Sequence, residues 1–443
     1  MTSRESLSRV PAGRERRAAG AHRPRVYLHI GEPKTGTTFL QRAMWGNRAR
    51  LARQGVLLPG YKRQDHSRAS RDLREAERPD SDPADPWIGE WDVLVGQALQ
   101  APQAAVISDE VLAACTPEQA DRAVRSLLSA EVHVILAVRD FGTLLPAEWQ
   151  ETVKTRGTEG WEEWLGTVID VESVAADRHL SRFWSFHDTL AALDMWSRHI
   201  PPDQVHVITM PRQGGNDELW TRFASVIGVD PGSIELTGLR VNSSLGLGET
   251  EFLRLLNLEL PEDLPYWFYT RYVKHLLAHN VLDARARQER LVLPPDREIW
   301  ARQQSESLVA GLRESKFHIV GDLGELLTRP AAGRYLSPAD QPVEHILGAA
   351  VAVAASLVDQ MYREKHPAGG QPKERRSLRR KASELEWTIL NGPWAKRVLR
   401  SASHIRAVRR LRVAIWRLLM HPARGPGQIQ ASYAIEDDVT DSD

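Results

Sequence analysis

The sequence predicts an α/β fold with a largely parallel central sheet and a helical C-terminal half. In the first half of the chain, short apolar segments alternate with segments whose apolar residues recur at helical spacing. Val132 to Val138 is an unbroken apolar run, which is typical of a strand buried on both faces of a parallel sheet. From Ser244 onward the patterns are helical.

Five strands are predicted in the first half of the chain, each in a short apolar segment. They cover residues 25–30, 56–59, 104–108, 132–138 and 205–210. The helices among them are predicted at residues 37–53, 87–99, 116–129, 146–156 and 189–199. Thr116 and Pro117 are a typical N-cap and first-turn pair. The polar segment 62–86 contains proline and lacks periodicity, so it predicts a loop or a mobile flap.

The second half of the chain is predicted to be helical, with an extension beyond it. Helical patterns cover residues 249–258, 266–282, 297–315 and 345–362. Gly369-Gly370-Gln371-Pro372 then interrupts the chain. The sequence therefore predicts a disordered tail at residues 1–24, one domain at residues 25–365, and a basic helical extension with an acidic tail at residues 366–443.

The charge of the chain is unevenly distributed. Lys and Arg number 58, as do Asp and Glu, so the net charge is zero. Between Lys373 and Arg417, however, fourteen Lys and Arg stand against three Asp and Glu. The rest of the chain is therefore acidic, and we do not expect it to bind nucleic acid generically. The single cysteine, Cys115, allows no intramolecular disulfide and argues against a cysteine-based metal site.

The sequence gives no sign of secretion or of a membrane span. The N-terminal segment has no apolar core region, and the longest apolar run, Ile346 to Val358, is thirteen residues. We therefore expect a cytoplasmic protein. The basic extension predicts an amphipathic helix that suits an anionic membrane surface at the inner face, through residues 373–420. A solvated helix docked on the acidic body is the open alternative.

A phosphate-binding loop is predicted between the first strand and the first helix, at GEPKTGTT from Gly31 to Thr38. Glycines let the backbone curl so that N–H groups point inward, and the helix N-terminus adds a positive dipole end. In nucleoside-triphosphate loops of this spacing a lysine follows the second glycine. Here Thr37 occupies that place, and Lys34 lies two residues before Gly36.

At these residues the sequence resembles the sulfotransferase superfamily, whose loop reads P-K-[TS]-G-[TS]-[TS]. The longer form HIGEPKTGTTFLQ is similar to the bacterial, particularly actinobacterial, branch. The resemblance implies a P-loop-like three-layer sandwich and a 3′-phosphoadenosine-5′-phosphosulfate (PAPS) donor. It implies that the 5′-phosphosulfate is held by Lys34, Thr35, Gly36, Thr37 and Thr38. A sulfuryl group carries less charge than a phosphoryl group, so no metal is expected.

Arg139 follows the apolar strand 132–138, where an arginine can meet an anion in the crevice at the carboxyl edge of the sheet. The resemblance implies that Arg139 binds the 3′-phosphate, with a serine eight residues later. That residue is Ala147 here, and either Thr143 or Lys154 could compensate.

The segment Arg240 to Gly246 also resembles bacterial sulfotransferases, which implies that Asn242 and Ser244 contact the nucleotide or the substrate.

Sulfuryl transfer to an alcohol needs in-line placement, a cation for the leaving phosphate and a base for the acceptor proton. Lys34 can supply the cation. Glu110 is the first candidate for the base, because strand 104–108 ends at the same sheet edge as Lys34. The alternative for Glu110 is a helix cap shared with Ser108. His29 is the second candidate, although a histidine in a strand is more often a core residue.

Weaker candidates for the base are His66 and His187. The aromatic residues between Gly160 and His187 suit a sugar or a hydrophobic acceptor, but helix packing is the favoured interpretation. They are Trp161, Trp164, Phe183, Trp184 and Phe186.

The sequence thus predicts a PAPS-dependent sulfotransferase that acts on a hydroxyl or amine of a small-molecule, glycolipid or carbohydrate acceptor. Two alternatives remain open. One is a P-loop kinase or NTPase, since AAVISDE resembles a Walker B strand, although no lysine follows Gly36. The other is a non-catalytic, membrane-associated nucleotide-binding module.

Overall fold

The computed structural model describes residues 23–75, 87–169, 182–239, 244–285, 290–331 and 335–365. The predicted extension at residues 366–443 lies outside the described residues, as does the predicted tail apart from residues 23 and 24.

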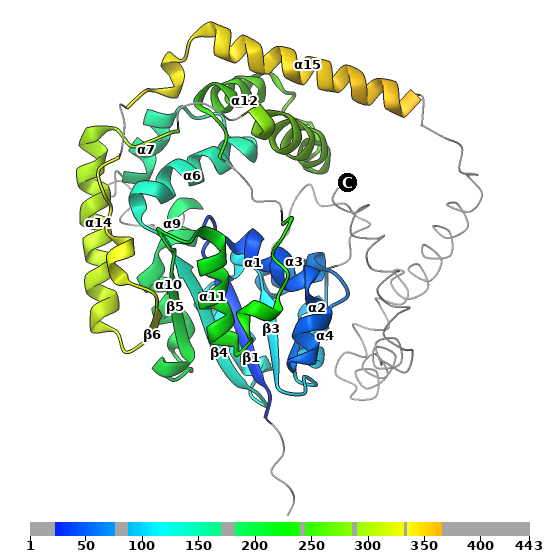
Figure 1. The fold of residues 1–443 in the computed structure, drawn as a ribbon, viewed down its shortest axis with the longest axis vertical. Coiled ribbons are helices and arrows are strands. Elements are labelled where there is room, and N and C mark those ends of the chain that lie inside the picture. Colours follow the sequence, from blue (N-terminus) through cyan, green and yellow to red (C-terminus); the bar gives the residue numbers. More distant parts are fainter. Residues whose placement is uncertain are drawn as a thin grey trace, which may run out of the picture.

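A six-stranded, fully parallel sheet forms the centre of the molecule, with strand order β2-β3-β1-β4-β5-β6 (Figure 1). The strands are β1 (Arg25–Gly31), β2 (Val56–Leu57), β3 (Ala104–Ser108), β4 (Glu131–Val138), β5 (Val205–Thr209) and β6 (His318–Val320). The five predicted strands and the parallel sheet are confirmed. The sequence did not predict β6, because three residues are too few to show a strand periodicity.

The strand order changes direction beside β1, and we call the region outside the carboxyl ends of the strands at this point the crevice. From β1 the chain moves to β2 and β3 on one side, and then crosses to β4, β5 and β6 on the other. In open parallel sheets, ligands bind outside the carboxyl ends of the strands at the point where this direction reverses. The phosphate-binding loop leaves β1 at that point.

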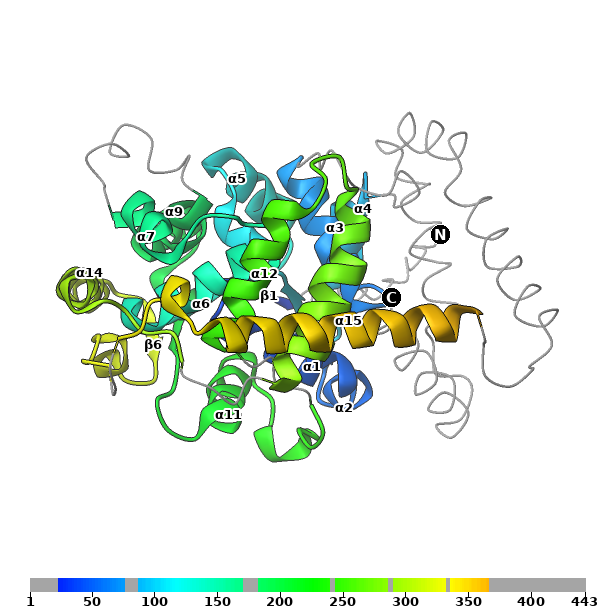
Figure 2. The same cartoon turned by 90° about the horizontal axis from the view of Figure 1, so that it is seen from above.

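Helices cover both faces of the sheet and complete three layers (Figures 1 and 2). Successive β1 side chains point to opposite faces, so Tyr27 and Leu28 belong to different apolar clusters. Tyr27 packs with α1 (Thr37–Gly46), α2 (Arg48–Arg53) and α11 (Gly215–Ile227). Leu28 packs with residues of α4 (Glu90–Ala98), α5 (Pro117–Ser126) and α10 (Thr189–Ser197). The predicted fold class is therefore confirmed.

Residues 63–74 form helix α3 (Arg63–Arg74), so the prediction of a loop there was wrong. The carboxylate of Asp65 accepts the backbone N–H groups of Tyr61 (2.7 Å) and Lys62 (3.1 Å) at the start of the helix. The buried face of α3 is largely polar, and it includes Asp65, His66 and Asp72. A buried face made of polar residues gives no apolar period for a sequence pattern to detect.

The remaining helices make an upper layer beyond the carboxyl edge of the sheet (Figure 1) and a flanking layer. The α-helices are α6 (Phe141–Lys154), α7 (Trp161–Ile169), α9 (Arg182–His187), α12 (Leu247–Glu259), α13 (Tyr266–Phe268), α14 (Pro295–Glu314) and α15 (Val343–Lys365). A π-helical segment, η5 (Tyr269–Leu282), continues α13. Short 3₁₀ turns are η1 (Glu110–Ala114), η3 (Pro202–Gln204), η4 (Pro231–Ser233), η6 (Asp283–Arg285), η7 (Leu323–Leu326) and η8 (Pro338–Asp340).

Candidate functional site

The loop between β1 and α1 has the backbone geometry of an anion site. Lys34 (φ +63°) and Gly36 (φ +79°) both adopt left-handed backbone conformations, which curl the chain. The hydroxyl of Thr35 donates to the carbonyl of Glu32 (2.5 Å) and tightens the turn. Gly36 caps α1 without any side-chain hydrogen bond. The N–H groups of the first turn of α1 are therefore left to meet a ligand.

Gly36 also packs too closely for any other residue. A Cβ at Gly36 would lie 2.4 Å from Cδ2 of Leu219 on α11. At the other end of the loop, a Cβ at Gly31 would lie 3.1 Å from the carbonyl oxygen of Glu110. The loop is thus held between α11 and η1.

Three lysines surround one glutamate at the mouth of this loop. Oε2 of Glu151 lies 2.5 Å from Nζ of Lys34, and Oε1 lies 2.8 Å from Nζ of Lys274 on η5. Burial alone would raise the pKa of Glu151, but the neighbouring lysines hold it well below its usual range. We call Lys34, Lys154, Lys274 and Glu151 the lysine cluster.

Lys154 is the most deeply buried member of the lysine cluster, with 4% of its surface exposed. Burial, and then the nearby charge of Lys34, lower the pKa of Lys154 to about 8. A buried ammonium is costly without an anion to compensate it. With its lysines protonated the cluster has an excess of positive charge, which suits an anionic ligand.

Four residues that bear on the site lie on one face of α6. Thr143, Ala147, Glu151 and Lys154 follow one another at spacings of four, four and three residues, so they share that face. At the start of the face, Nε of Arg139 donates to the hydroxyl of Thr143 (2.8 Å). Nη1 of Arg139 donates to the carbonyl of Lys34 (3.1 Å), which ties the arginine to the phosphate loop.

This geometry separates the two candidates for completing the Arg139 site. Thr143 touches Arg139 directly. Lys154 lies eleven residues further along α6, which is roughly 16 Å at the rise of an α-helix. Thr143 therefore belongs with Arg139, and Lys154 belongs with Lys34.

Glu110 is half-buried at the start of η1. Nε2 of Gln41 lies 3.3 Å from its Oε2 and also 3.3 Å from the hydroxyl of Ser108. Burial alone would lower the pKa of Lys274, but Glu151, with a smaller contribution from the charge of Glu110, raises it, so Glu110 lies near the lysine cluster.

The capping role that was considered for Glu110 belongs to Asp109. The carboxylate of Asp109 accepts the backbone N–H of Val111 (3.1 Å) at the start of η1. Burial, and then the charge of Glu110, raise the pKa of Asp109 to about 7. The carboxylate of Glu110 is therefore not committed to that cap.

His29 and His66 are core residues, each with 1% of its surface exposed. Nδ1 of His29 lies 2.8 Å from the hydroxyl of Ser108. His66, on α3, donates from Nε2 to the carbonyl of Pro59 (2.8 Å) and accepts the N–H of Ser108 at Nδ1 (3.1 Å). Burial lowers the pKa of each histidine to about 4, so both are neutral at pH 7. Both support the end of β3 from inside the core.

His187 lies buried between two carboxylates and is not exposed to the crevice. Nδ1 is 3.3 Å from Oε2 of Glu32, and Nε2 is 3.6 Å from Oε2 of Glu148. Thr189 donates a further hydrogen bond to Glu32. Burial alone would lower the pKa of His187, but Glu148 and Glu32 raise it to about 9. The charged imidazole joins the phosphate loop to α6.

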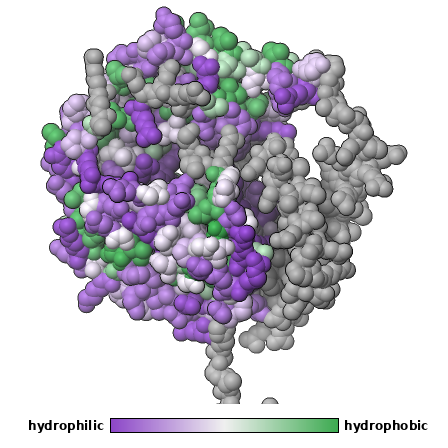
Figure 3. All heavy atoms as spheres, in the orientation of Figure 1, coloured by the Kyte–Doolittle hydropathy of each residue, from purple (hydrophilic) through white to green (hydrophobic). Residues whose placement is uncertain are grey.

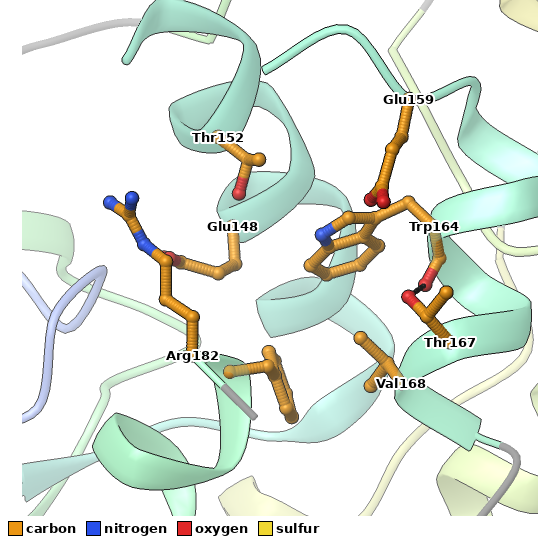
Figure 4. A pocket seen from close by; sticks show the side chains of 8 residues that line it. Glu148, Thr152, Glu159, Trp164, Thr167, Val168 and Arg182 are labelled. Carbon is orange, nitrogen blue, oxygen red and sulfur yellow. Dashed lines mark hydrogen bonds between the residues drawn. The ribbon is translucent and has the colours of Figure 1, made fainter. Parts of the chain in front are cut away.

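A cavity of about 220 Å³ lies between α6, α7 and α9 (Figure 4). Trp164 and Phe183 line it, but together with Trp161 and Trp184 they are also buried members of the apolar core. Packing therefore accounts for part of the aromatic group. The cavity is lined by Glu148, Thr152, Glu159, Trp164, Thr167, Val168, Arg182 and Phe183.

Ser244 is exposed and lies next to a residue that α6 holds in place. Nε2 of Gln150 donates to the carbonyl of Leu245 (2.8 Å) and to the hydroxyl of Thr250 (3.2 Å). Asn242 lies outside the described residues.

Sequence reasoning missed Lys274 and the partner of Lys34. Lys274 is on a helical segment far along the chain, and no motif surrounds it. Lys154 was predicted only as a possible supplement to Arg139, and Glu151 was not predicted as a partner of Lys34. Their spacing of three on a helix was the signal that could have placed both side chains on one face.

The structure is an α/β protein with a glycine-containing loop and a cluster of lysines at the carboxyl edge of a parallel sheet. Among the described residues, no group of three or more His, Cys, Asp or Glu side chains is arranged to hold a metal ion. A scan against protein-family models found no match, and neither did a search of curated proteins. A crystal structure of a sulfotransferase from Alicyclobacillus acidocaldarius matches with 14% sequence identity and a TM-score of 0.31. The match covers 54% of this chain and 93% of that one.

Proposed function

We propose that this protein is a sulfotransferase that moves a sulfuryl group from PAPS to a hydroxyl or amine of an acceptor. The observation that carries the proposal is the lysine cluster at the mouth of the phosphate loop. Lys34 leaves the loop before Gly36, pairs with Glu151 and lies beside two further lysines. This arrangement supplies cationic side chains to an anion that is held by the loop backbone.

The residues of the crevice divide between the two ends of the donor. The loop N–H groups, with Thr37 and Thr38, hold the 5′-phosphosulfate, and the lysine cluster surrounds it. Arg139 and Thr143 hold the 3′-phosphate at the start of α6, supported by their mutual hydrogen bond of 2.8 Å. The donor supplies a sulfuryl group on a phosphate that can leave as 3′,5′-ADP.

Side chains at the crevice assist the transfer. Lys34 exchanges Glu151 for the phosphate oxygen on which negative charge grows as the bond from that oxygen to sulfur breaks. Glu110 takes the proton that the acceptor hydroxyl loses when its oxygen bonds to sulfur. The buried position of Lys154 strengthens its attraction for the departing anion.

We place this reaction in the cytoplasm, with a small-molecule, glycolipid or carbohydrate acceptor. The rival enzyme class is a P-loop kinase or NTPase. One observation favours it, because β3 lies directly beside β1 and ends in Asp109, as a Walker B strand would. The lysine before Gly36, in place of one after it, favours the sulfotransferase.

Titration calorimetry with 3′,5′-ADP, ATP and Mg²⁺-ATP tests the proposal. We expect 3′,5′-ADP to bind tightly without magnesium and Lys34→Ala to weaken it strongly. Lys316→Ala, which changes an exposed lysine remote from the loop in sequence, is the matched control. A preference for Mg²⁺-ATP would overturn the sulfotransferase.

Binding of 3′,5′-ADP alone would also be shown by a module that has lost turnover. PAPS should therefore be offered with a broad acceptor panel, and sulfated products should be sought by mass spectrometry. Binding without any transfer would favour the non-catalytic module.

A further inference from the structure

Helix α15 carries an apolar stripe that faces away from the domain. We call Val343, Leu347, Val351, Val358 and Met361 the α15 stripe. Their side chains are 73%, 59%, 61%, 66% and 58% exposed. Their spacings of four, four, seven and three residues put them along one side of a helix.

The opposite side of α15 packs on the domain. Ala349 and Val353 are 0% and 5% exposed, and the helix contacts α12 and η5. Figure 2 shows α15 crossing these helices and extending beyond them. Figure 3 shows apolar residues along the rim where α15 lies in Figure 1. The domain therefore leaves the α15 stripe uncovered.

The length and composition of α15 are unusual for an exposed helix. Ile346 to Val358 contains no charged residue. In the described part of the chain, one helical segment, Val343–Arg363, is long and apolar enough to cross a membrane, and 11% of its most apolar window is buried. An apolar patch of this extent on a soluble domain marks an interaction site.

The chain beyond α15 indicates which partner covers the stripe. Lys373 comes eight residues after the end of α15 at Lys365, and it opens the stretch to Arg417 with fourteen Lys and Arg against three Asp and Glu. An apolar surface next to a dense positive charge fits an anionic lipid surface. A second copy of this chain would instead bring a second basic stretch to the same place, and the two would repel.

We propose that the α15 stripe lies on an anionic membrane surface, with its apolar side chains at the boundary between headgroups and acyl chains. The basic stretch strengthens the attachment, but α15 forms the docking surface. Because α15 packs directly on η5, which carries Lys274, docking brings the crevice within one helix layer of the bilayer. The proposal does not depend on sulfuryl transfer.

Flotation of the full-length protein with phosphatidylcholine vesicles, with and without phosphatidylserine, tests the proposal. We expect flotation with the phosphatidylserine vesicles. The variant Leu347→Glu/Val351→Glu/Val358→Glu should bind them at least tenfold more weakly, since three apolar side chains no longer leave water. The control Leu258→Glu/Ile299→Glu changes side chains that are 54% and 59% exposed on α12 and α14, and it should float like the wild type.

Three outcomes would overturn the proposal. The wild type could fail to float, or the triple variant could float equally well because the basic stretch suffices. Light scattering supplies the third outcome: a wild-type dimer that the triple variant turns into a monomer would make α15 an interface between copies. Circular dichroism should show that both variants keep the helical content of the wild type, since the changed side chains are exposed.

Discussion

Glu110 and Asp109 are adjacent carboxylates with different surroundings. Asp109 caps η1 through the N–H of Val111, and burial raises its pKa to about 7. Glu110 is half-buried and lies near the lysine cluster. Only Glu110 is thus available to an acceptor.

If Glu110 is the general base, Glu110→Gln should lower turnover by roughly 10² to 10⁴. Affinity for 3′,5′-ADP should stay within about threefold, because the loop residue Gly31 packs against the backbone of Glu110, which this substitution leaves unchanged. Transfer assays and calorimetry on the same preparations measure both. Glu163→Gln, an exposed change on α7, is the control. Turnover equal to the wild type would remove Glu110 from the mechanism.

Glu151 competes with a bound anion for Lys34. We expect Glu151→Gln to tighten 3′,5′-ADP binding by about three- to tenfold, because the site gains positive charge and Lys34 is released from its ion pair. Calorimetry at low and high salt measures this gain, which should shrink as salt screens the charges. Weaker binding by Glu151→Gln would mean that the glutamate positions Lys34 for the ligand.

At the scale of single elements, α1 offers a matched pair of glycines. Gly36 precedes the first turn of the helix with φ +79°, and a Cβ added there would lie 2.4 Å from Leu219. A Cβ added at Gly46 would have no atom within 4 Å. Gly36→Ala should abolish measurable 3′,5′-ADP binding and lower the free energy of unfolding by about 1–3 kcal/mol. Gly46→Ala should raise it by up to about 1 kcal/mol. Urea unfolding measures the stability of each variant, and calorimetry measures its 3′,5′-ADP binding. Equal effects of the two substitutions would contradict the special role of Gly36 in the loop.

Elements with an apolar period were predictable, and those without one were not. The capping pair Thr116 and Pro117 marked α5 correctly, and a full capping box with Gln119 is present. By contrast, α3 buries mostly polar side chains, and β6 has three residues. The break between α1 and α2 depends on Asn47, whose amide donates to the carbonyls of Ala43 (2.9 Å) and distant Glu235 (2.8 Å). Such a contact cannot be seen in a local pattern.

At the scale of the whole molecule, buried histidines set how stability depends on pH. Burial lowers the pKa of His29 and His66 to about 4, and burial and neighbouring histidines lower that of His206 to about 3. The unfolded chain takes up these protons near pH 6.5, so stability is lost as the pH falls below that value. His187, raised to about 9, stabilises fully below pH 6.5, and its contribution is lost as the pH rises through 9.

We therefore expect the combined contribution of these four histidines to stability to be greatest near pH 6.5, with Asp109 opposing it on the acid side and Lys154 on the alkaline side. Urea midpoints from pH 5 to pH 10 measure this dependence in a range where exposed carboxylates stay ionised. In a plot of unfolding free energy against pH, His187→Gln should flatten the decline above pH 6.5. His66→Gln should reduce the slope below pH 6.5 by the amount that corresponds to about one proton. A midpoint that rises steadily from pH 6.5 to pH 9 would contradict the charged state of His187.

The sequence predicted the sheet, and it also marked the glycine-rich loop after β1 and Arg139 after β4, because each has characteristic neighbouring residues. The binding roles of the loop and of Arg139 stay predictions. The sequence did not predict the lysine cluster as a unit. Lys34, Glu151 and Lys274 come from the loop, α6 and η5, and only packing of the upper layer on the sheet edge unites them. The buried ion pairs of His187 with Glu32 and Glu148 likewise join residues of the loop, α9 and α6 that only tertiary packing brings together.

The dispersed origin of the lysine cluster has a consequence during synthesis. Strands β1 to β5 have all left the ribosome once Thr209 has emerged, and by then Lys34 and Glu151 can already pair. Lys274 emerges later, so a growing chain has a phosphate loop whose lysine is held by Glu151 alone. The second lysine reaches Glu151 only after η5 has been made. The lysine cluster can therefore be completed only after β1 to β5 have been made, but before β6 has emerged.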